Sequence, residues 1–433
     1  MPMPAASMAD FWAGDAHFEY VAKGRFYGPD GNFGANVGFH IVPGPGGVWY
    51  LFHREYDFGV RPAYCEGPDY ARIVLRNSSD EGRTWSDPPV VVAEPTPGWP
   101  SECALVDGAA FYEHVTNTWH YLAQCLGRVQ SWNMCHFSGV GSNPMSVRFA
   151  PTFNASHPSV AGGQLWGPIC SGAGKHCTNQ TIDEGTPEIV EFDVSTRQFY
   201  VTFHGWDAVA NRSARGVART ADFVTWSTHG DHLPNDAIMS RVDCEKWTSA
   251  PNFSWAAGGC VGGGEGTILR SEGFYYHLIE APDRSLGCFT SPGEQNWVLG
   301  LLRSETWQPA GKWTPFTVMP TVVPIVKQGC YIQYHRLFAD ASREGTVYLE
   351  FWADNWMQIH KLVGGRAALP IIARPPPEGA PNCTTRMSCA ASCEALVVCP
   401  SDGTMYCCAD RVHCGGQHRC ASMPGLVDCA CHT

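Results

Sequence analysis

The pattern of apolar and polar positions repeats along the first 370 residues of the chain. An alternating apolar stretch, a turn and a second alternating stretch that opens with aromatic residues recur five times. Alternation with a period of two residues predicts a β-hairpin in each repeat. The repeats lie 71 to 79 residues apart, measured between their anchoring tyrosines: Tyr50, Tyr121, Tyr200, Tyr276 and Tyr348. This near-constant period indicates one supersecondary unit that is used five times.

A further predicted strand follows three of the hairpins and ends in a shared motif. The segments 71–85, 215–226 and 298–307 each contain an arginine, then an acidic residue, then Thr-Trp. The first segment holds the full pattern S-x-D-x-G-x-T-W from Ser78 to Trp85, which resembles the Asp-box of sialidase-like propellers. In such a turn the aspartate accepts backbone N–H groups and the tryptophan packs between neighbouring sheets. We therefore expect a structural role for this motif.

Five such units predict an all-β fold, a five-bladed β-propeller, because a ring of sheets leaves few strand edges exposed. We expect the propeller to span residues 1–369. The predicted blades lie around residues 30–95, 100–150, 183–230, 262–308 and 330–369.

A second, small domain is predicted at the C-terminus. The proline-rich segment 370–382 has the composition of an extended linker, and residues 383–433 contain ten cysteines. That density is typical of small modules held together by disulfides. The segment CCADRVHC at 407–414 is similar to the core of granulin modules, although Gly415 stands where that family has its next paired cysteine. We expect a stable appendage, or an attachment site for a glycan or a protein partner.

Composition points to an oxidising compartment. The chain has 20 cysteines, ten of them between Cys65 and Cys330, and even numbers in both parts favour disulfides. Six N-x-S/T sequons agree with a secreted, extracellular glycoprotein, although Met1–Trp12 lacks the pattern of a signal peptide. The net charge of -12 and the lack of a basic run argue against nucleic acid as the partner, and no apolar run is long enough to span a membrane. The predicted glycosylation sites are Asn77, Asn154, Asn179, Asn211, Asn252 and Asn382.

Propeller geometry predicts where chemistry occurs. The innermost strand of each blade begins at the central pocket and its hairpin partner returns there, so the residues at these strand ends converge. The predicted openings of the first strands are Asn36, Asp107, Glu184 or Glu188, Glu265 and Gln333. Several carboxyl groups in one pocket suit glycoside hydrolysis, which needs one protonated and one ionised carboxyl group.

The fourth unit carries a family resemblance. The segment GGGEGTILRSEGFYYHLIEA at 262–281 looks like the E-G-P…G-Y-Y-L segment of the five-bladed propeller glycoside hydrolases, the superfamily of arabinanases, β-xylosidases and invertases. The resemblance covers roughly residues 30 to 370. It implies that Glu265 is the general acid of an inverting glycosidase.

The resemblance leaves the other carboxylates open. It implies a second carboxylate in a D-P-x-hydrophobic setting, for which the sequence offers Glu184, Glu188 and Asp107. The family's base falls near Asn36, and an amide does not accept a proton at neutral pH. The alternatives are that Asp107 or Glu188 is the base, that another acid such as Asp30 reaches the site, or that the chain is not a hydrolase.

Further pocket residues are expected to contact a sugar, with blade packing or a structural ion pair as the alternative for each. His335 opens the inner strand of the fifth unit, where some relatives in the resemblance have a histidine near a cation on the axis. We predict no definite cofactor, and the resemblance allows a structural axial cation such as Ca²⁺. The predicted sugar contacts are Asn36, His53, Arg54, His204, Trp206, Asp207, Glu280, Trp352 and Asp354.

Three classes of function remain open on the sequence. The first is a secreted glycosidase that acts on an oligo- or polysaccharide, with a sialidase-like hydrolase as the second enzymatic interpretation. The second is a non-catalytic, lectin-like propeller that binds carbohydrate, which Asn36 favours. The third is a secreted structural protein whose two domains contact other proteins.

Overall fold

The computed structural model describes most of the propeller region and four short strands of the C-terminal region. Described are residues 6–26, 38–56, 58–65, 70–99, 101–127, 132–152, 185–207, 212–224, 226–228, 266–282, 297–306, 313–316, 322, 332–353, 356–365, 395–398, 405–408, 419–423 and 426–430. The chain divides into two compact units, one of residues 1–285 and 293–367, the other of residues 286–292 and 368–433.

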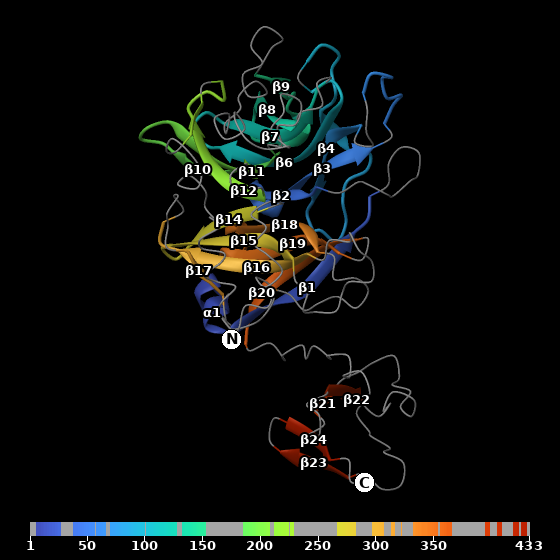
Figure 1. Cartoon of the computed structure of the whole chain (residues 1–433), viewed down its shortest axis with the longest axis vertical. Coiled ribbons are helices and arrows are strands. Elements are labelled where there is room, and N and C mark those ends of the chain that lie inside the picture. The colour runs from blue at the N-terminus through green and yellow to red at the C-terminus, as the bar shows by residue number, and fades with distance from the viewer. Residues whose placement is uncertain are drawn as a thin grey trace. The chain divides into compact units, whose positions relative to one another are not determined.

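The first unit is a five-bladed β-propeller, as the repeats predict (Figure 1). Each blade is a four-stranded antiparallel sheet. The first three blades are β2(His40–Pro43), β3(Trp49–Tyr56), β4(Ala71–Ser78) and β5(Val90–Ala93); β6(Ala104–Glu113), β7(Thr118–Leu126), β8(Trp132–Val140) and β9(Ala150–Pro151); and β10(Gly185–Asp193), β11(Gln198–Asp207), β12(Arg212–Thr220) and β13(Trp226–Thr228). The fourth is β14(Gly266–Ser271), β15(Phe274–Pro282), β16(Trp297–Ser304) and β17(Thr314–Pro315), and the fifth is β18(Gln333–Asp340), β19(Thr346–Ala353), β20(Trp356–Gly364) and β1(Ala16–Gly24).

The outer strand of the fifth blade comes from the other end of the chain. The repeat pattern placed this blade within 330–369, but its fourth strand is β1, which pairs with β20 from Ala16 opposite Gly364 to Gly24 opposite Met357. Helix α1(Met8–Ala13) precedes it, with Ser7 and Asp10 forming a capping box. Phe11 of α1 packs against Phe316 of the fourth blade. The N-terminal segment thus closes the ring by completing the last sheet.

The second unit contains a small sheet with the strand order β22(Met405–Cys408), β21(Ala395–Val398), β24(Leu426–Ala430) and β23(Arg419–Met423). Strands β21 and β24 are parallel, and the other two pairs are antiparallel. The granulin-like character of this module stays a prediction.

The Asp-box is a structural turn, as its sequence predicts. The Asp80 carboxylate accepts from the Thr84 N–H at 2.9 Å and from the Thr84 hydroxyl at 2.7 Å, and the Ser78 hydroxyl accepts from the Gly82 N–H at 2.9 Å. Trp85 packs on the apolar cluster that joins the first and fifth blades. The motif therefore fixes an outer turn against the neighbouring blade.

The axis of the propeller is lined by one equivalent position from each inner strand, which we call the hub positions. Each lies opposite the residue two after the anchoring tyrosine of its blade. The hub positions are His40, Gly108, Glu188, Thr267 and Arg336.

Arg336 joins three blades at these positions. Its Nη2 donates to the carbonyl of Gly108 at 2.9 Å, and its Nη1 lies 3.3 Å from Oε1 of Glu188. The same Oε1 accepts from the Thr267 hydroxyl at 2.7 Å, and Oε2 accepts from the Ile268 N–H at 3.0 Å. We call these four groups, Gly108, Glu188, Thr267 and Arg336, the hub clasp. Because Arg336 is only 1% exposed, its charge depends on these partners rather than on water.

The fifth and first blades meet through a buried carboxyl group. Glu350, which is 0% exposed, accepts from the Ile41 N–H at 2.8 Å through Oε1, and its Oε2 has no hydrogen-bond partner among the described residues. Burial raises the pKa of Glu350 to about 8, against the opposing effects of the Ile41 N–H and Arg336. Glu350 therefore remains protonated in the folded protein at pH values where an unfolded chain ionises it.

A double-mutant cycle tests the hub clasp. We expect Arg336→Met to lower the free energy of unfolding by about 3–5 kcal/mol, because it leaves a buried carboxylate without its cation. Adding Glu188→Gln should restore part of that loss, since the amide carries no charge. Urea unfolding of the two single variants and the double variant measures the coupling. Strictly additive losses would show that the pair contributes no interaction energy.

The protonation of Glu350 predicts a pH-dependent stability. Between about pH 4.5 and pH 8 the folded state holds a proton that the unfolded state releases, so the free energy of unfolding should fall as the pH rises through this window. Glu350→Gln removes this effect. The difference in the free energy of unfolding, variant minus wild type, should therefore be more positive at pH 8 than at pH 4.5, by about 2 kcal/mol or more. Urea unfolding at both pH values measures this, with Glu344→Gln in the exposed turn of the same hairpin as control. An equal difference at both values would contradict the assignment.

Candidate functional site

Asp107 lies at the edge of the hub, at an irregularity in the inner strand of the second blade. Val106 pairs with Gln124 and Gly108 pairs with Ala123, so Asp107 is the extra residue of a β-bulge in β6. Bulges reorient a side chain without ending a strand and are common beside active sites. Here the bulge directly precedes the hub position Gly108.

Arg54 of β3 holds this carboxylate. Its Nη1 lies 3.0 Å from Oδ1 of Asp107, and its Nη2 donates to the hydroxyl of Tyr334 at 2.7 Å. The centre of the guanidinium lies 4.8 Å from the ring of Tyr334 and 5.4 Å from the ring of Tyr56. Both charged side chains are about one-tenth exposed. The first, second and fifth blades thus build one cluster, an anion and a cation enclosed by aromatic rings.

The inner strands approach this region through similar backbone turns. We call the residue two before each hub position a mouth position. At three mouth positions φ is positive, with values of 71° at Gly38, 38° at Thr186 and 51° at Tyr334. Such values are strained for residues other than glycine, and strain of this kind is concentrated at functional sites. The five mouth positions are Gly38, Val106, Thr186, Glu265 and Tyr334.

The mouth positions show how the carboxyl groups are distributed among the blades. Among them only the fourth-blade position, Glu265, is a carboxylic acid. The first blade has Gly38, and the third has Thr186 directly before Pro187. Glu265 itself lies outside the described residues, so its place in this comparison rests on the pairing of the following residues, Gly266 and Thr267.

Glu188 has a different environment from Asp107. Both of its oxygens are engaged within the hub clasp, by Arg336, Thr267 and the Ile268 N–H. These contacts tie together three blades, which is the geometry of a structural carboxylate. The other predicted acid of this blade, Glu184, lies outside the described residues.

His53 points to the opposite face of β3 from Arg54. Its Nδ1 lies 2.9 Å from the carbonyl oxygen of Arg54, its Nε2 accepts from Nε of Arg76 at 3.2 Å, and its ring stacks on Phe26. Burial, together with the nearby Arg76, lowers the pKa of His53 to about 3, so the imidazole is neutral. These contacts are typical of blade packing.

The remaining predicted residues fall into three groups. Trp352 is buried in the cluster between the first and fifth blades. Nε2 of His335 lies 3.0 Å from the carbonyl oxygen of Leu278, and Asn77 is a half-buried residue of β4. For four residues only the backbone is described: His204, Trp206 and Asp207 in β11, and Glu280 in β15. Outside the described residues lie Asn36, Asp354, Asn154, Asn179, Asn211, Asn252 and Asn382.

Within the described residues no group of three or more His, Cys, Asp or Glu side chains is arranged to hold a metal ion. The axial cation therefore stays a prediction. No helix in the described part of the chain has the length and apolar character needed to cross a membrane.

The sequence did not single out Tyr334, Arg336, His40 or Glu350. His40 accepts from the Ala110 N–H through Nδ1 at 2.6 Å, and burial and Arg336 hold its pKa well below the usual value. The signal in the sequence that pointed to Arg336 was its distance along the chain from the anchoring tyrosine. Arg336 and Glu188 each lie twelve residues before the anchoring tyrosine of their blade, whereas hairpins of other lengths shift this count elsewhere.

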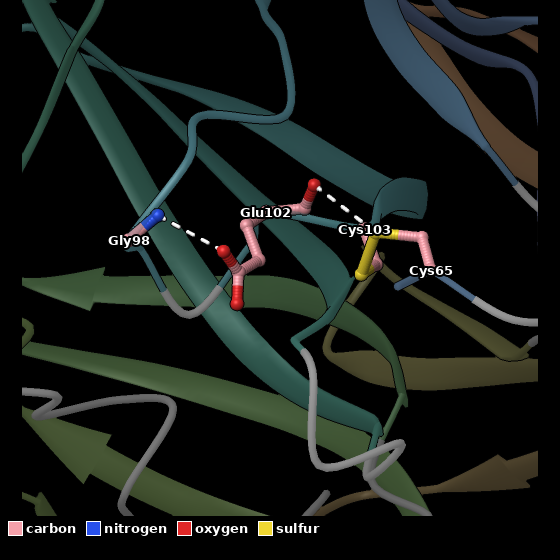
Figure 2. Close-up of a disulfide and its surroundings, with 4 residues drawn as sticks. All are labelled: Cys65, Gly98, Glu102 and Cys103. Atoms are coloured by element: carbon pink, nitrogen blue, oxygen red, sulfur yellow. Dashed lines mark hydrogen bonds between the residues drawn. A yellow bond between two sulfur atoms is a disulfide. The ribbon is translucent and has the colours of Figure 1, made fainter. Parts of the chain in front are cut away.

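A disulfide anchors the strand that carries Asp107. Cys65, after β3, is bonded to Cys103, directly before β6, with their Cα atoms 5.2 Å apart (Figure 2). The Glu102 carboxylate accepts from the Gly98 N–H at 3.0 Å in the same loop. A second disulfide, Cys125–Cys135, joins β7 to β8. The first and second blades are therefore covalently joined a few residues from Asp107.

Comparisons with known proteins support the fold. The sequence matches no protein-family model and no curated protein sequence. Among solved structures, a chain described as a glycoside hydrolase has a TM-score of 0.50 and 11% identity, over 85% of this chain and 98% of that chain. An endo-arabinase from Bacteroides thetaiotaomicron VPI-5482 has a TM-score of 0.49 and 10% identity, over 78% and 97% of the two chains. A family 117 glycoside hydrolase from the marine bacterium Zobellia galactanivorans has values of 0.47 and 13%, over 80% and 90%.

Identities this low show a shared fold and transfer no residue roles. The predicted resemblance is confirmed at the level of the fold: the chain is a five-bladed β-propeller, and a solved structure described as a glycoside hydrolase matches it at a TM-score of 0.50.

Proposed function

We propose that the chain is a secreted glycoside hydrolase that cleaves an oligo- or polysaccharide in its central pocket by acid/base catalysis with two carboxyl groups. The observation that carries the proposal is the Asp107–Arg54–Tyr334 cluster at the end of the hub. It places a carboxylate, supported by residues from three blades, beside the positions where the inner strands begin. Glycoside hydrolysis needs such a carboxylate together with a protonated partner.

Glu265 is the proposed general acid. It occupies the mouth position of the fourth blade in sequence, and the E-G segment that contains it carries the resemblance to the propeller glycosidases. The second carboxyl group is drawn from Asp107, Glu188 and Glu184. In this proposal the sugar contacts are Asn36, Arg54, His204, Trp206, Asp207, Glu280 and Asp354. His53 and Trp352, which the sequence also predicted as contacts, are buried in the packing of the blades and are not among them.

Secretion is part of the proposal. Two disulfides among the described residues, Cys65–Cys103 and Cys125–Cys135, are typical of proteins that fold in an oxidising compartment. The six sequons and the cysteine-rich module agree with this location.

A lectin-like propeller is the second candidate, and one observation favours it. The mouth positions of the first and third blades, Gly38 and Thr186, carry no carboxyl group, and Glu188 is fully engaged in the hub clasp. A pocket with fewer free carboxylates can still bind sugar hydroxyl groups without cleaving the substrate.

A substrate panel with one variant distinguishes the candidates. We expect turnover of an aryl glycoside or of a plant, algal or fungal polysaccharide, and a fall in kcat of about 100-fold or more in Glu265→Gln, because the amide has no proton to give to the leaving oxygen. The control is Glu305→Gln, an exposed acid of the same blade. Binding of a polysaccharide without turnover by the wild type would favour the lectin. Full activity in Glu265→Gln would overturn the assignment of the acid.

A further inference from the structure

The first blade leaves a space at its mouth position, and a side chain from the second blade fills it. A Cβ atom built on Gly38 would lie 2.4 Å from Oδ1 of Asp107 and 3.6 Å from Cδ of Arg54. A contact of 2.4 Å is far inside van der Waals distance, so no side chain at residue 38 can coexist with Asp107 in its present position. The Asp107 carboxylate occupies the volume into which a side chain of the first blade would project.

Four features keep the carboxylate in this position. The bulge in β6 directs the side chain out of the normal alternation, and the Cys65–Cys103 disulfide fixes the start of that strand. Arg54 provides the cation at 3.0 Å, and Tyr334 accepts a second N–H of the same guanidinium at 2.7 Å. The positive φ of Gly38 keeps the first-blade backbone in a conformation that glycine adopts without strain.

We propose that Asp107 is the proton acceptor of the pocket. It belongs to the second blade but occupies the volume that a first-blade side chain would fill, and Gly38, Arg54 and Tyr334 position it. This inference rests on the proposed hydrolase function and assigns the partner of Glu265. Asp107 is assigned as the proton acceptor in preference to Glu188, because both oxygens of Glu188 are engaged by Arg336, Thr267 and the Ile268 N–H.

Asp107 and Glu265 together account for both proton transfers in the proposed hydrolysis. The Asp107 carboxylate accepts a proton from a water molecule as the water oxygen bonds to the anomeric carbon. The bond between that carbon and the glycosidic oxygen breaks, and Glu265 gives its proton to the leaving oxygen. Proton return through solvent restores both groups, and the products are two sugars with free hydroxyl groups.

A carboxylate exchange between the two blades tests the proposal. Asp107→Gly should lower kcat by about 100-fold or more, as expected for the loss of a general base. Adding Gly38→Asp returns a carboxylate to the same volume from the first blade, and aspartate tolerates a positive φ better than most residues. We expect the double variant to recover at least tenfold in kcat over Asp107→Gly. Sodium azide, as a small external nucleophile, should also accelerate Asp107→Gly.

A matched pair of glycine variants tests the positioning role. Gly38→Ala should lower kcat by about tenfold or more with a smaller change in KM, because its Cβ displaces the carboxylate. Gly46→Ala is the control, since Gly46 lies in the same blade with φ of 73°, and in the described part of the chain no atom lies within 4 Å of an added Cβ. Equal kcat in the two variants would show that only backbone strain matters at residue 38.

The outcomes separate this inference from the proposed function. Full activity in Asp107→Gly would overturn the inference while the hydrolase function stands. Loss of activity without recovery by either Gly38→Asp or azide, in variants whose circular dichroism matches the wild type, would also overturn it. Absence of turnover by the wild-type chain on the whole panel would instead reject the hydrolase function on which the inference rests.

Discussion

The centre of the propeller depends on the hydrogen bond and the ion pair made by the guanidinium of Arg336. A closed ring of sheets brings five inner strands together at its axis, where backbone groups and side chains are shielded from water. Arg336 binds the Gly108 carbonyl of the second blade and Glu188 of the third, and Glu188 in turn binds Thr267 of the fourth. In the first blade, the His40 imidazole accepts from the Ala110 N–H and the Ile41 N–H donates to Glu350. These polar groups pair largely with one another rather than with water, which lowers the cost of burying charge at the axis.

The contacts at the hub distinguish two carboxylates of the inner strands, Glu188 and Asp107. Glu188 and Asp107 are both buried carboxylates on inner strands, but the first is held at both oxygens within the clasp and the second is held by one cation beside the mouth positions. The clasp joins the inner strands of the second to fifth blades. Bulges in β6, β10 and β18 occur directly before or at Asp107, Glu188 and Arg336. The two carboxylates therefore differ in their partners: Glu188 is held within the clasp, and Asp107, the proton acceptor in our proposal, is held by Arg54.

The outer parts of the fold hold this centre in place. Strand β1 completes the fifth sheet, so the two ends of the propeller sequence meet in one blade. The Asp-box fixes the turn before Trp85, and the Cys65–Cys103 disulfide joins the first and second blades beside Asp107. Each device limits the relative movement of adjacent blades, which is what a site assembled from several blades requires. The cysteine-rich module is a separate unit with its own small sheet.

The sequence by itself determined the all-β class, the number of blades and the Asp-box turn, because period-two alternation, the spacing of the tyrosines and the turn motif are local properties. It also brought Asp107 and Arg54 forward as pocket residues, though not as partners. Only the tertiary structure decided that β1 closes the fifth blade, that Glu188 belongs to a clasp with Arg336, and that Asp107 fills the space beside Gly38. These facts depend on contacts between residues that are tens to hundreds of positions apart, such as Arg54 with Tyr334. Hairpins of unequal length and bulges shift the register from blade to blade, so counting along the chain does not reveal which side chains meet at the axis.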